Sequence, residues 1–473
     1  MRFNFAIAAA LLFAFASVYA ESQIISGESA ISGRSALTTV ARLADRSCAG
    51  RLSGHYGYTN AARWTLGRFT EMGLNGTLQP YSSPYSIVDG GRLEVTLHEE
   101  KLIAEMLTDF MPLLFSDSGH VKARAVFVGW GIRAPEHGYD DYANIDVSDK
   151  FVLCFRGAPD DDQKWVHHDE HRTRMKVALE KGAVGLIYVY PRVIAHPNGD
   201  LQSAFLTAMI SDSFFDKLLT VEGTTSESLQ RQLLRTGRPA SLSLDAVIDL
   251  TVKARHFPKG EGYNVVACLY GADPGFKHEC VVIGAHLDGV GDHAGFRFPG
   301  AEDNASGCAV VMEIAKAFMA NSIRPKRSVV FVLFGSEEQG GRGSAHFIDR
   351  LPPGLARISA FINFDMVGIG GKANIGINEF MEIHRNMLEQ SDQKRSVISN
   401  VRLIKSLGVR SGDIAPFFKK NIPLATVSSN GLRPKNQYHQ PGDLPGLAQP
   451  MIMESISKLM FRFAFELCEV NPI

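Results

Sequence analysis

The sequence has no excess of charge of either sign. Its 473 residues include 49 lysines and arginines and 50 aspartates and glutamates, and the formal net charge is −1. A protein that binds nucleic acid or an anionic membrane through its overall field carries a surplus of basic residues. The composition therefore argues against both kinds of partner and favours a small molecule.

Long apolar runs are missing after residue 20, where no stretch reaches the length that spans a bilayer. The first 20 residues contain one arginine, a short apolar run from Phe5 to Val18, and small side chains at Val18 and Ala20, the two positions that a signal peptidase inspects. A membrane anchor would need a longer run. We therefore expect residues 1–20 to be a cleaved signal peptide. The mature protein would then be exported, periplasmic or secreted, with no stable membrane insertion.

The six cysteines lack the CxxC spacing of a structural zinc site. Cys268 and Cys280 lie on two apolar runs on either side of a turn and could face each other across a hairpin. Export permits a disulfide without requiring one, and buried cysteine often packs as a small apolar residue. We favour this second interpretation.

The first half of the chain changes from a helical to a β-rich pattern. Residues 59–72 have apolar side chains at helical spacing, and Gly73 ends the predicted helix. From about residue 92 onward, short β-rich runs are separated by Gly, Asp and Pro, with one predicted helix at 174–181. This change of pattern indicates a separate β-rich module.

From residue 264 onward, uninterrupted apolar runs alternate with loops and amphipathic helices, including a predicted helix at 304–320. Strands that are buried on both faces have this pattern, so the predicted fold is α/β, with a mostly parallel central sheet flanked by helices. We predict that residues 21–90 and 251–473 form this larger domain. The β-rich module, residues 91–250, would be inserted between its two parts.

Histidine or acidic side chains follow four of these apolar runs, and another acidic side chain begins the helix after the first of them. In an open α/β sheet, ligands bind beyond the carboxyl ends of the strands, so we expect these side chains to converge in one crevice. The candidate metal ligands are His286, Asp303, Glu338, Asp365 and His439.

Two histidines and three carboxylates form a mixed nitrogen and oxygen ligand set that suits zinc, with one carboxylate left to bridge two ions about 3.5–4 Å apart. Such ions lower the pKa of a water, which becomes the nucleophile. Glu337, directly before Glu338, is placed to act as the general base. Asp288 is placed to accept the second ring N–H of His286 and fix the orientation of the imidazole.

Each of these features alone is more often a solvated turn or a helix cap than a metal site. The prediction depends on the coincidence of five candidates at one edge of one sheet. The polar run His167–His171 is not expected to bind a metal, because consecutive residues cannot all face one ion. Asp292 and His293 are expected to lie in an ordinary solvent-exposed turn and to stay outside the site.

Five short motifs carry a resemblance to a known family. They are GAHLD at 284–288, GAEDNASG at 300–307, GSEEQGGRGS at 335–344, NFDMVG at 363–368 and YHQPGD at 438–443. In this order they resemble the di-zinc aminopeptidase family, which also includes glutamate carboxypeptidase. The resemblance covers about residues 280–445. It implies the zinc exopeptidase fold, which is phosphorylase/hydrolase-like, and two Zn²⁺ ions per chain.

The resemblance also implies a role for each candidate ligand. Asp303 would bridge the two ions. His286 and Asp365 would complete one metal site, and Glu338 and His439 the other. The residue before Glu338 would be the general base.

The inserted module resembles a protease-associated domain in the order of its segments 129–159 and 176–190. This resemblance implies that the module covers the cleft or shapes access to it and has no chemistry of its own. The segment Ser411–Phe417 departs from the family pattern because it lacks a histidine. In relatives this loop lines the substrate pocket, so the departure leaves substrate specificity open.

The expected function is hydrolysis of the N-terminal residue from peptides with a free N-terminus. A carboxypeptidase with the same site is the nearest alternative, although only 34 residues follow His439, too few for the helical dimerisation domain of those relatives. Carboxypeptidases also need arginines for the substrate carboxylate, and the arginines near the site loops are Arg297, Arg342, Arg410 and Arg433. Less favoured are a glutaminyl cyclase, which needs one zinc, and a non-catalytic receptor, which would lack ligands.

Overall fold

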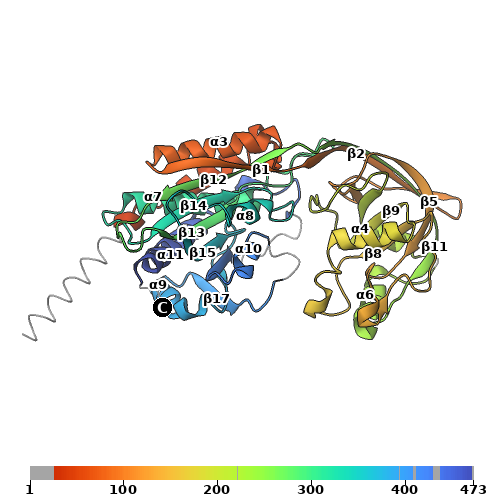
Figure 1. Ribbon diagram of the computed structural model, residues 1–473. Helices are drawn as coiled ribbons and strands as arrows, with labels where there is room; N and C mark the ends of the chain where they lie inside the picture. The colour runs from red at the N-terminus through yellow and green to blue at the C-terminus, as the bar shows by residue number, and fades with distance from the viewer. Residues whose placement is uncertain (1–25, 221, 394, 408–411, 430–436, 471–473) are drawn as a thin grey trace, which may run out of the picture.

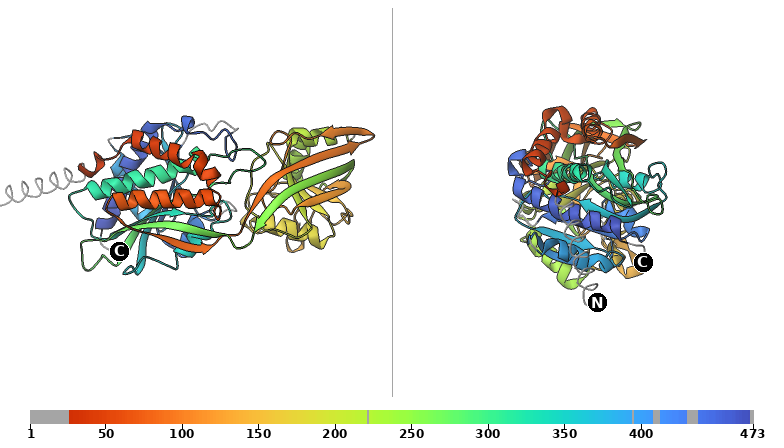
Figure 2. Two further views of the ribbon diagram at one scale, coloured as in Figure 1. Left: turned by 90° about the horizontal axis from the view of Figure 1, so that it is seen from above. Right: turned by 90° about the vertical axis from the view of Figure 1, so that its left-hand side faces the viewer.

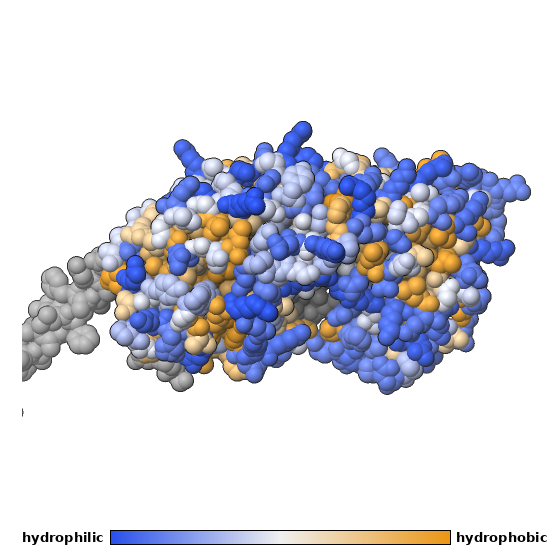
Figure 3. Space-filling view, turned by 45° about the horizontal axis from the view of Figure 1, so that its top comes forward, coloured by the Kyte–Doolittle hydropathy of each residue, from blue (hydrophilic) through white to orange (hydrophobic). Residues whose placement is uncertain are grey.

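The computed structural model describes residues 26–220, 222–393, 395–407, 412–429 and 437–470. The predicted signal peptide lies outside these residues. Within them, none of the helices has the length and apolar character needed to cross a membrane. Figure 3 shows a surface on which hydrophilic side chains surround scattered hydrophobic ones. The chain forms two lobes side by side, each built on its own sheet (Figure 1).

The first lobe contains, within the described residues, an eight-stranded sheet in the order β1-β12-β14-β13-β15-β18-β16-β17. In that order the strands are Asn75–Ser82, Glu261–Leu269, Ser328–Phe334, Glu279–His286, Arg357–Phe364, Leu424–Ser429, Ala373–Ile377 and Ile398–Leu403. The four adjacent strands β14, β13, β15 and β18 are parallel. Their carboxyl ends therefore meet at one edge, and the predicted α/β fold is confirmed.

The apolar runs of the sequence become these central strands because both of their faces are covered. Every residue of β13 and β14 is buried. The less favoured alternative for Cys268 and Cys280 is excluded, since β14 lies between their strands and they do not face each other across a hairpin. The six cysteines are all buried and free.

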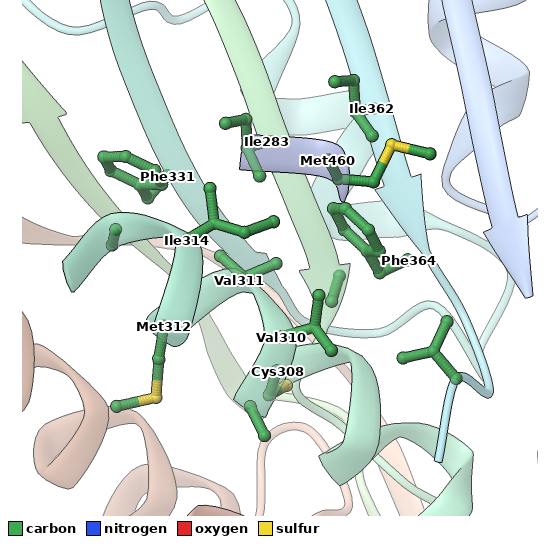
Figure 4. Close-up of a cluster of buried hydrophobic side chains, with 14 of the residues drawn as sticks. Ile283, Cys308, Val310, Val311, Met312, Ile314, Phe331, Ile362, Phe364 and Met460 are labelled. Carbon is green, nitrogen blue, oxygen red and sulfur yellow. The ribbon is translucent and has the colours of Figure 1, made fainter. Parts of the chain in front are cut away.

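One face of the sheet is covered by helices that include α7 (Ser306–Ala320) and α11 (Pro450–Glu469), and α2 (Gly33–Leu43) packs against both of them. Helix α7 lies in the middle and contacts both of the others (Figure 2). Its side chains Val311 and Ile314 point into the core toward Ile283, Phe331 and Phe364 of the sheet (Figure 4). A helix that is apolar on nearly all sides is a buried one, as α7 is.

Further helices of this lobe are α3 (Tyr56–Glu71), α8 (Arg342–Phe347), α9 (Arg385–Asp392) and α10 (Ile414–Lys419). Helix α3 contacts β12 and β1. On the face opposite α7, Phe347 of α8 and Phe417 of α10 pack with Phe334 and Phe361 of the sheet. Apolar cores on both faces thus fix the sheet edge that carries the candidate site.

The second lobe is the inserted module, whose sheet within the described residues has the order β3-β2-β11-β5-β8-β9-β10-β4. In that order the strands are Glu100–Ile103, Tyr85–Leu97, Leu242–Phe257, Gly119–Phe127, Phe151–Phe155, Gly185–Tyr190, Leu206–Ser211 and Phe110–Pro112. The module also contains a small sheet of two strands, β6 (Arg133–Ala134) and β7 (Tyr139–Asp140). Its α-helices within the described residues are α4 (His171–Glu180), α5 (Asp212–Leu218) and α6 (Ser226–Thr236). The module has its own apolar cores on both sides of the sheet.

The module is joined to the first lobe by two adjacent chain crossings (Figure 1). One crossing leads from β1 into β2 and the other from β11 into β12. The backbone N–H of Ser83 donates to the carbonyl of Gly260 at 2.8 Å, which ties the two crossings together. The strands β2 and β11, which pair along most of their length, carry the connection into the module.

Candidate functional site

The five candidate ligands lie at the carboxyl edge of the central sheet. His286 is the last residue of β13, and Asp365 directly follows β15. Glu338 lies in the turn after β14, and Asp303 lies in the segment Ala301–Ala305 that leads into α7. His439 follows β18 in the sequence. The parallel strands bring these residues together, although they span more than 150 residues of sequence.

The candidate ligands form two groups that share Asp303. Its Oδ1 lies 3.3 Å from Nε2 of His286, and its Oδ2 lies 3.3 Å from Nε2 of His439. Oδ1 of Asp365 is 3.5 Å from Nε2 of His286. Oε1 of Glu338 is 2.9 Å from Nε2 of His439. Each imidazole therefore has one carboxylate of its own, and Asp303 has one oxygen for each group.

Glu337 is held close to this cluster by a sharp turn. Ser336 has a positive φ of 56°, and its hydroxyl lies 2.8 Å from that of Ser83 and accepts from Tyr81 at 3.1 Å. Space for the carboxylate comes from Gly412, where a Cβ atom would lie 2.1 Å from Oε1 of Glu337. Glu337 therefore points into a space that any side chain at position 412 would fill.

Asp288 contacts both His286 and the turn that carries Glu337 and Glu338. The Nδ1–H of His286 donates to the backbone carbonyl of Asp288 at 3.1 Å, whereas the Asp288 carboxylate is 3.7 Å from this nitrogen. The carboxylate instead accepts the backbone N–H groups of Glu337 and Glu338, each at 3.1 Å. Asp288 therefore is the partner of the second ring N–H of His286, as predicted, but through its backbone carbonyl and not through its carboxylate.

Asp443 and Arg51 position the site loops, and sequence reasoning missed both. The Asp443 carboxylate accepts the backbone N–H groups of Glu302 and Asp303 at 2.9 and 3.1 Å. Arg51 is fully buried, and it donates to four backbone carbonyls. These belong to Leu43 at 2.9 Å, Leu287 at 2.8 Å, Pro299 at 2.7 Å and Gly300 at 2.7 Å. The YHQPGD motif contained the signal for Asp443, but no local pattern marked Arg51.

The inserted module contacts the site at His439. The Nδ1–H of His439 donates to the backbone carbonyl of Ala195 at 2.8 Å, and the N–H of Ala195 donates to the carbonyl of His439 at 3.1 Å. The side chain of Gln440 donates to the carbonyl of Val193. Tyr438 packs against an apolar cluster of the module. The orientation of this imidazole therefore depends on the second lobe, a contact that the sequence could not reveal.

Charge in the site is dominated by carboxylates. Burial opposes a charge on either histidine, yet the neighbouring carboxylates, Asp303 and Asp365, raise the pKa of His286 well above its usual value. Against the same effect of burial, Glu338 and Asp303 raise the pKa of His439 to about 10. Burial and the nearby charges of Glu338 and other acids raise the pKa of Glu337 well above its usual range, with His286 opposing. The negative charge of these carboxylates thus favours a cation, either a protonated imidazole or a bound ion, at the centre of the cluster.

The residues present fit a pair of zinc ions. Ligand atoms of His286, Asp303 and Glu338 all lie within 4.8 Å of one another. Among the described residues, the ion pairs of Asp303, Glu338 and Asp365 are with histidines alone. Oδ1 of Asp365 is buried and makes no hydrogen bond within the described part of the chain. Buried carboxylates need a compensating cation, and a nitrogen and oxygen donor set of this kind suits zinc.

A cavity of about 500 Å³ opens beside the cluster and is lined by His286, Glu337 and Asp365. The remaining polar residues that line it include Asn363, Asn374, Arg402, Lys405, Asp413 and Ser428. Sequence reasoning did not find Asn374 and Arg402, because β16 and β17, which contribute them, contain no motif. Asn363 lies in the NFDMVG motif, and Asp413 lies in the segment that lines the substrate pocket in relatives of the resembled family. The cavity has the position and volume needed to hold part of a substrate.

The arginines singled out from the sequence do not line this cavity where they are described. Arg297 donates to the backbone carbonyl of Ala44 at 3.0 Å, and Arg342 lies 3.6 Å from Asp200 of the module. Arg410 and Arg433 lie outside the described residues. The basic side chains that do line the cavity are Arg402 and Lys405.

Comparison with solved structures defines the class of fold. The structure matches an aminopeptidase from Aneurinibacillus sp. strain AM-1 with a TM-score of 0.69, at 19% identity, over 95% of this chain and 98% of that one. It matches a zinc aminopeptidase from Bacillus subtilis with a TM-score of 0.63, also at 19% identity, over 92% of this chain and 95% of that one. The fold is therefore that of the zinc aminopeptidases.

The sequence comparison points to the same class. Residues 264–464, less than half of the chain, match the model of Peptidase family M28. An aminopeptidase of Pseudomonas aeruginosa strain UCBPP-PA14 is 27% identical over 339 residues, which is 70% of this chain. This chain covers 56% of the length of that relative. The resemblance to the co-catalytic zinc exopeptidase family is thereby confirmed.

The first prediction concerns Arg51. Arg51→Met leaves four buried carbonyls without a donor, and we expect a loss of about 3 kcal/mol or more in the free energy of unfolding, measured by urea denaturation. Arg46→Met, at an exposed position of the same segment, should change it by no more than about 0.5 kcal/mol. A loss below about 1 kcal/mol for Arg51→Met would show that Arg51 does not hold these loops.

The second prediction concerns Ala195. Ala195→Pro removes the N–H that pairs with the His439 carbonyl, and we expect zinc affinity to fall about 10- to 100-fold, the usual effect of losing support for a metal ligand. Competition with a chromophoric chelator measures the affinity. Ala195→Gly keeps the N–H and needs no extra space, so it serves as the control. A folded proline variant with the zinc affinity of the glycine variant would contradict the role assigned to this contact.

Proposed function

We propose that the protein is a zinc-dependent exopeptidase, and specifically an aminopeptidase that removes N-terminal residues from peptides. The observation that supports this function best is the arrangement of two imidazole–carboxylate groups around the shared carboxylate of Asp303, next to Glu337 and an open cavity. The family of residues 264–464 and the names of the relatives agree with it.

In this proposal, His286, Asp303, Glu338, Asp365 and His439 hold two zinc ions. When bound, such a pair supplies Lewis-acid chemistry, since it lowers the pKa of water and polarises a carbonyl. The chain must then move protons and orient the substrate.

Glu337 is the proposed general base. Its raised pKa suits a carboxylate that accepts a proton from water and passes it to the leaving amine. The Asp288 carboxylate keeps Glu337 and Glu338 in place, because it holds both backbone N–H groups of their turn. The free α-amine of a substrate carries a positive charge, which the surplus of carboxylates beside the cavity would attract.

The module is proposed to be a protease-associated domain over residues 91–250 that shapes access to the cleft. Its contact with His439 through Ala195 supports a place for it beside the site. Export by a signal peptide at residues 1–20 is part of the same proposal, and it depends on the sequence pattern alone.

A carboxypeptidase is the second candidate function. Arg402 and Lys405 line the cavity beside Glu337 and could bind a substrate carboxylate. An aminopeptidase binds the positively charged α-amine of its substrate at the site, whereas a carboxypeptidase binds the negatively charged α-carboxylate. Substrates in which the N-terminus or the C-terminus is blocked therefore distinguish the two functions.

The third prediction is a substrate and metal test. Aminoacyl chromogenic substrates with a free N-terminus should be cleaved, whereas the same substrates with an acetylated N-terminus and substrates that report C-terminal cleavage should not. Complete chelation should abolish turnover, and Zn²⁺ should restore it. Cleavage of only the C-terminal substrates would replace the aminopeptidase by the carboxypeptidase. Full activity in protein proven free of metal would contradict both.

The fourth prediction is that Glu337→Gln lowers kcat by about 10²- to 10⁴-fold, because the amide cannot accept the proton. Zinc content should stay at the wild-type value, since Glu337 is not a proposed ligand, and metal analysis of the same sample checks this. Glu227→Gln, at an exposed position on α6 in the module, should behave as wild type. Turnover of Glu337→Gln within a few-fold of wild type would mean that another group is the base.

A further inference from the structure

A second cluster of metal-binding side chain types lies in the inserted module. Ligand atoms of Glu136, His137 and His168 all lie within 4.8 Å of one another. Nε2 of His168 is 3.0 Å from Oε1 of Glu136, and the rings of His137 and His168 meet edge to face at 5.8 Å. None of these residues belongs to the proposed catalytic site.

Two separate loops build this cluster. Glu136 and His137 belong to the short helix η2 (Pro135–His137), which ends at Gly138 with a positive φ of 69°. His168 follows the short helix η3 (Gln163–Trp165). Only His168 of the His167–His171 run takes part, and the additional ligands come from a loop about 30 residues earlier in the chain, so neighbouring residues do not have to face one ion.

A buried tryptophan holds the two imidazoles in place. Trp165 is 5% exposed, and its ring lies 5.5 Å from that of His137 and 6.2 Å from that of His168, both edge to face. Its Nε1–H donates to Asp160 at 2.7 Å. The two histidines thus have much of their positional freedom removed before any ligand binds, which lowers the entropic cost of binding.

The other end of the His168 loop is also anchored. Asp169, the next residue, accepts from Arg156 at 2.5 Å and pairs with Arg174 at 2.7 Å. Arg174 is fully buried and also donates to the carbonyl of Trp130 at 2.7 Å. Because the backbone next to His168 is fixed, mainly the side chain of His168 would have to move when a ligand binds.

The donor set and its spacing suit a transition metal. Two imidazole nitrogens and one carboxylate oxygen are typical zinc ligands, and tetrahedral zinc places its ligand atoms about 3.4 Å apart. The pair Glu136–His168 is already near this distance, and a small rotation of the exposed His137 and Glu136 side chains brings in the third atom. A fourth position facing solvent remains for water.

We propose that Glu136, His137 and His168 bind one divalent transition-metal ion, with Zn²⁺ as the natural occupant, which clamps the loop at 135–137 to the loop at 163–168. This ion is additional to the proposed catalytic pair and independent of it. Its role is to stiffen two loops of the module, and it would not take part in hydrolysis.

The test is a Zn²⁺ titration of the metal-free full chain by isothermal titration calorimetry, with equilibrium dialysis to count bound zinc. Wild type should bind one more Zn²⁺ per chain than His137→Gln or His168→Gln. His120→Gln is the matched control, because His120 also pairs with a carboxylate, Asp249 at 2.8 Å, but has no second histidine. The control should bind as many ions as wild type, whatever the number held by the catalytic site.

A second measurement separates loss of the site from misfolding. Zn²⁺ should slow proteolytic cleavage of the loop at 158–168 in wild type and in His120→Gln, and should have no effect on it in Glu136→Gln or His137→Gln, whose side chains are exposed and not needed for folding. Equal zinc counts in wild type and in both histidine variants would overturn the proposal. So would zinc protection of the loop that persists in Glu136→Gln and His137→Gln.

Discussion

The candidate site depends on one buried carboxylate that lies between two imidazoles. Asp303 is 5% exposed, and its two oxygens lie 3.3 Å from His286 and 3.3 Å from His439. A buried carboxylate without compensating charge costs several kcal/mol. The two histidines supply that charge in the structure, and their neighbourhood holds the pKa of Asp303 below its usual range even though burial opposes this. The placement of the other ligands follows, because each imidazole needs a carboxylate partner of its own.

Two further buried aspartates fix the backbone rather than the imidazoles. Asp288 and Asp443 each accept two consecutive N–H groups of a loop that carries candidate ligands. Burial raises the pKa of Asp288 to about 7 and that of Asp443 to about 6. So many acids close together repel one another unless cations lie among them. Metal binding and the stability of these loops are therefore coupled, since ions that bind the folded site also stabilise it.

The features that could be predicted from the sequence are those that depend on a local pattern of residues. Apolar runs without polar interruption identified the central strands, and side chains at their carboxyl ends identified the cluster around Asp303. Contacts between distant segments could not be predicted in the same way. Arg51 reaches a carbonyl 236 residues away and Ala195 accepts from a residue 244 away, and neither lies in a motif. The sequence also could not predict which oxygen of Asp288 accepts the ring N–H of His286, because the backbone and side-chain oxygens belong to the same residue.

The two lobes are joined at two places that differ in their consequences. Ser83 and Gly260 tie the two chain crossings, where a strand of one lobe ends a few residues before a strand of the other begins. The second attachment, between Ala195 and His439, ends on a candidate metal ligand. Rotation about the first would break the hydrogen bonds of the second, each worth about 1 kcal/mol. A movement of the module away from the first lobe would therefore also free the imidazole of His439, so the position of the module and the orientation of this candidate ligand are physically linked.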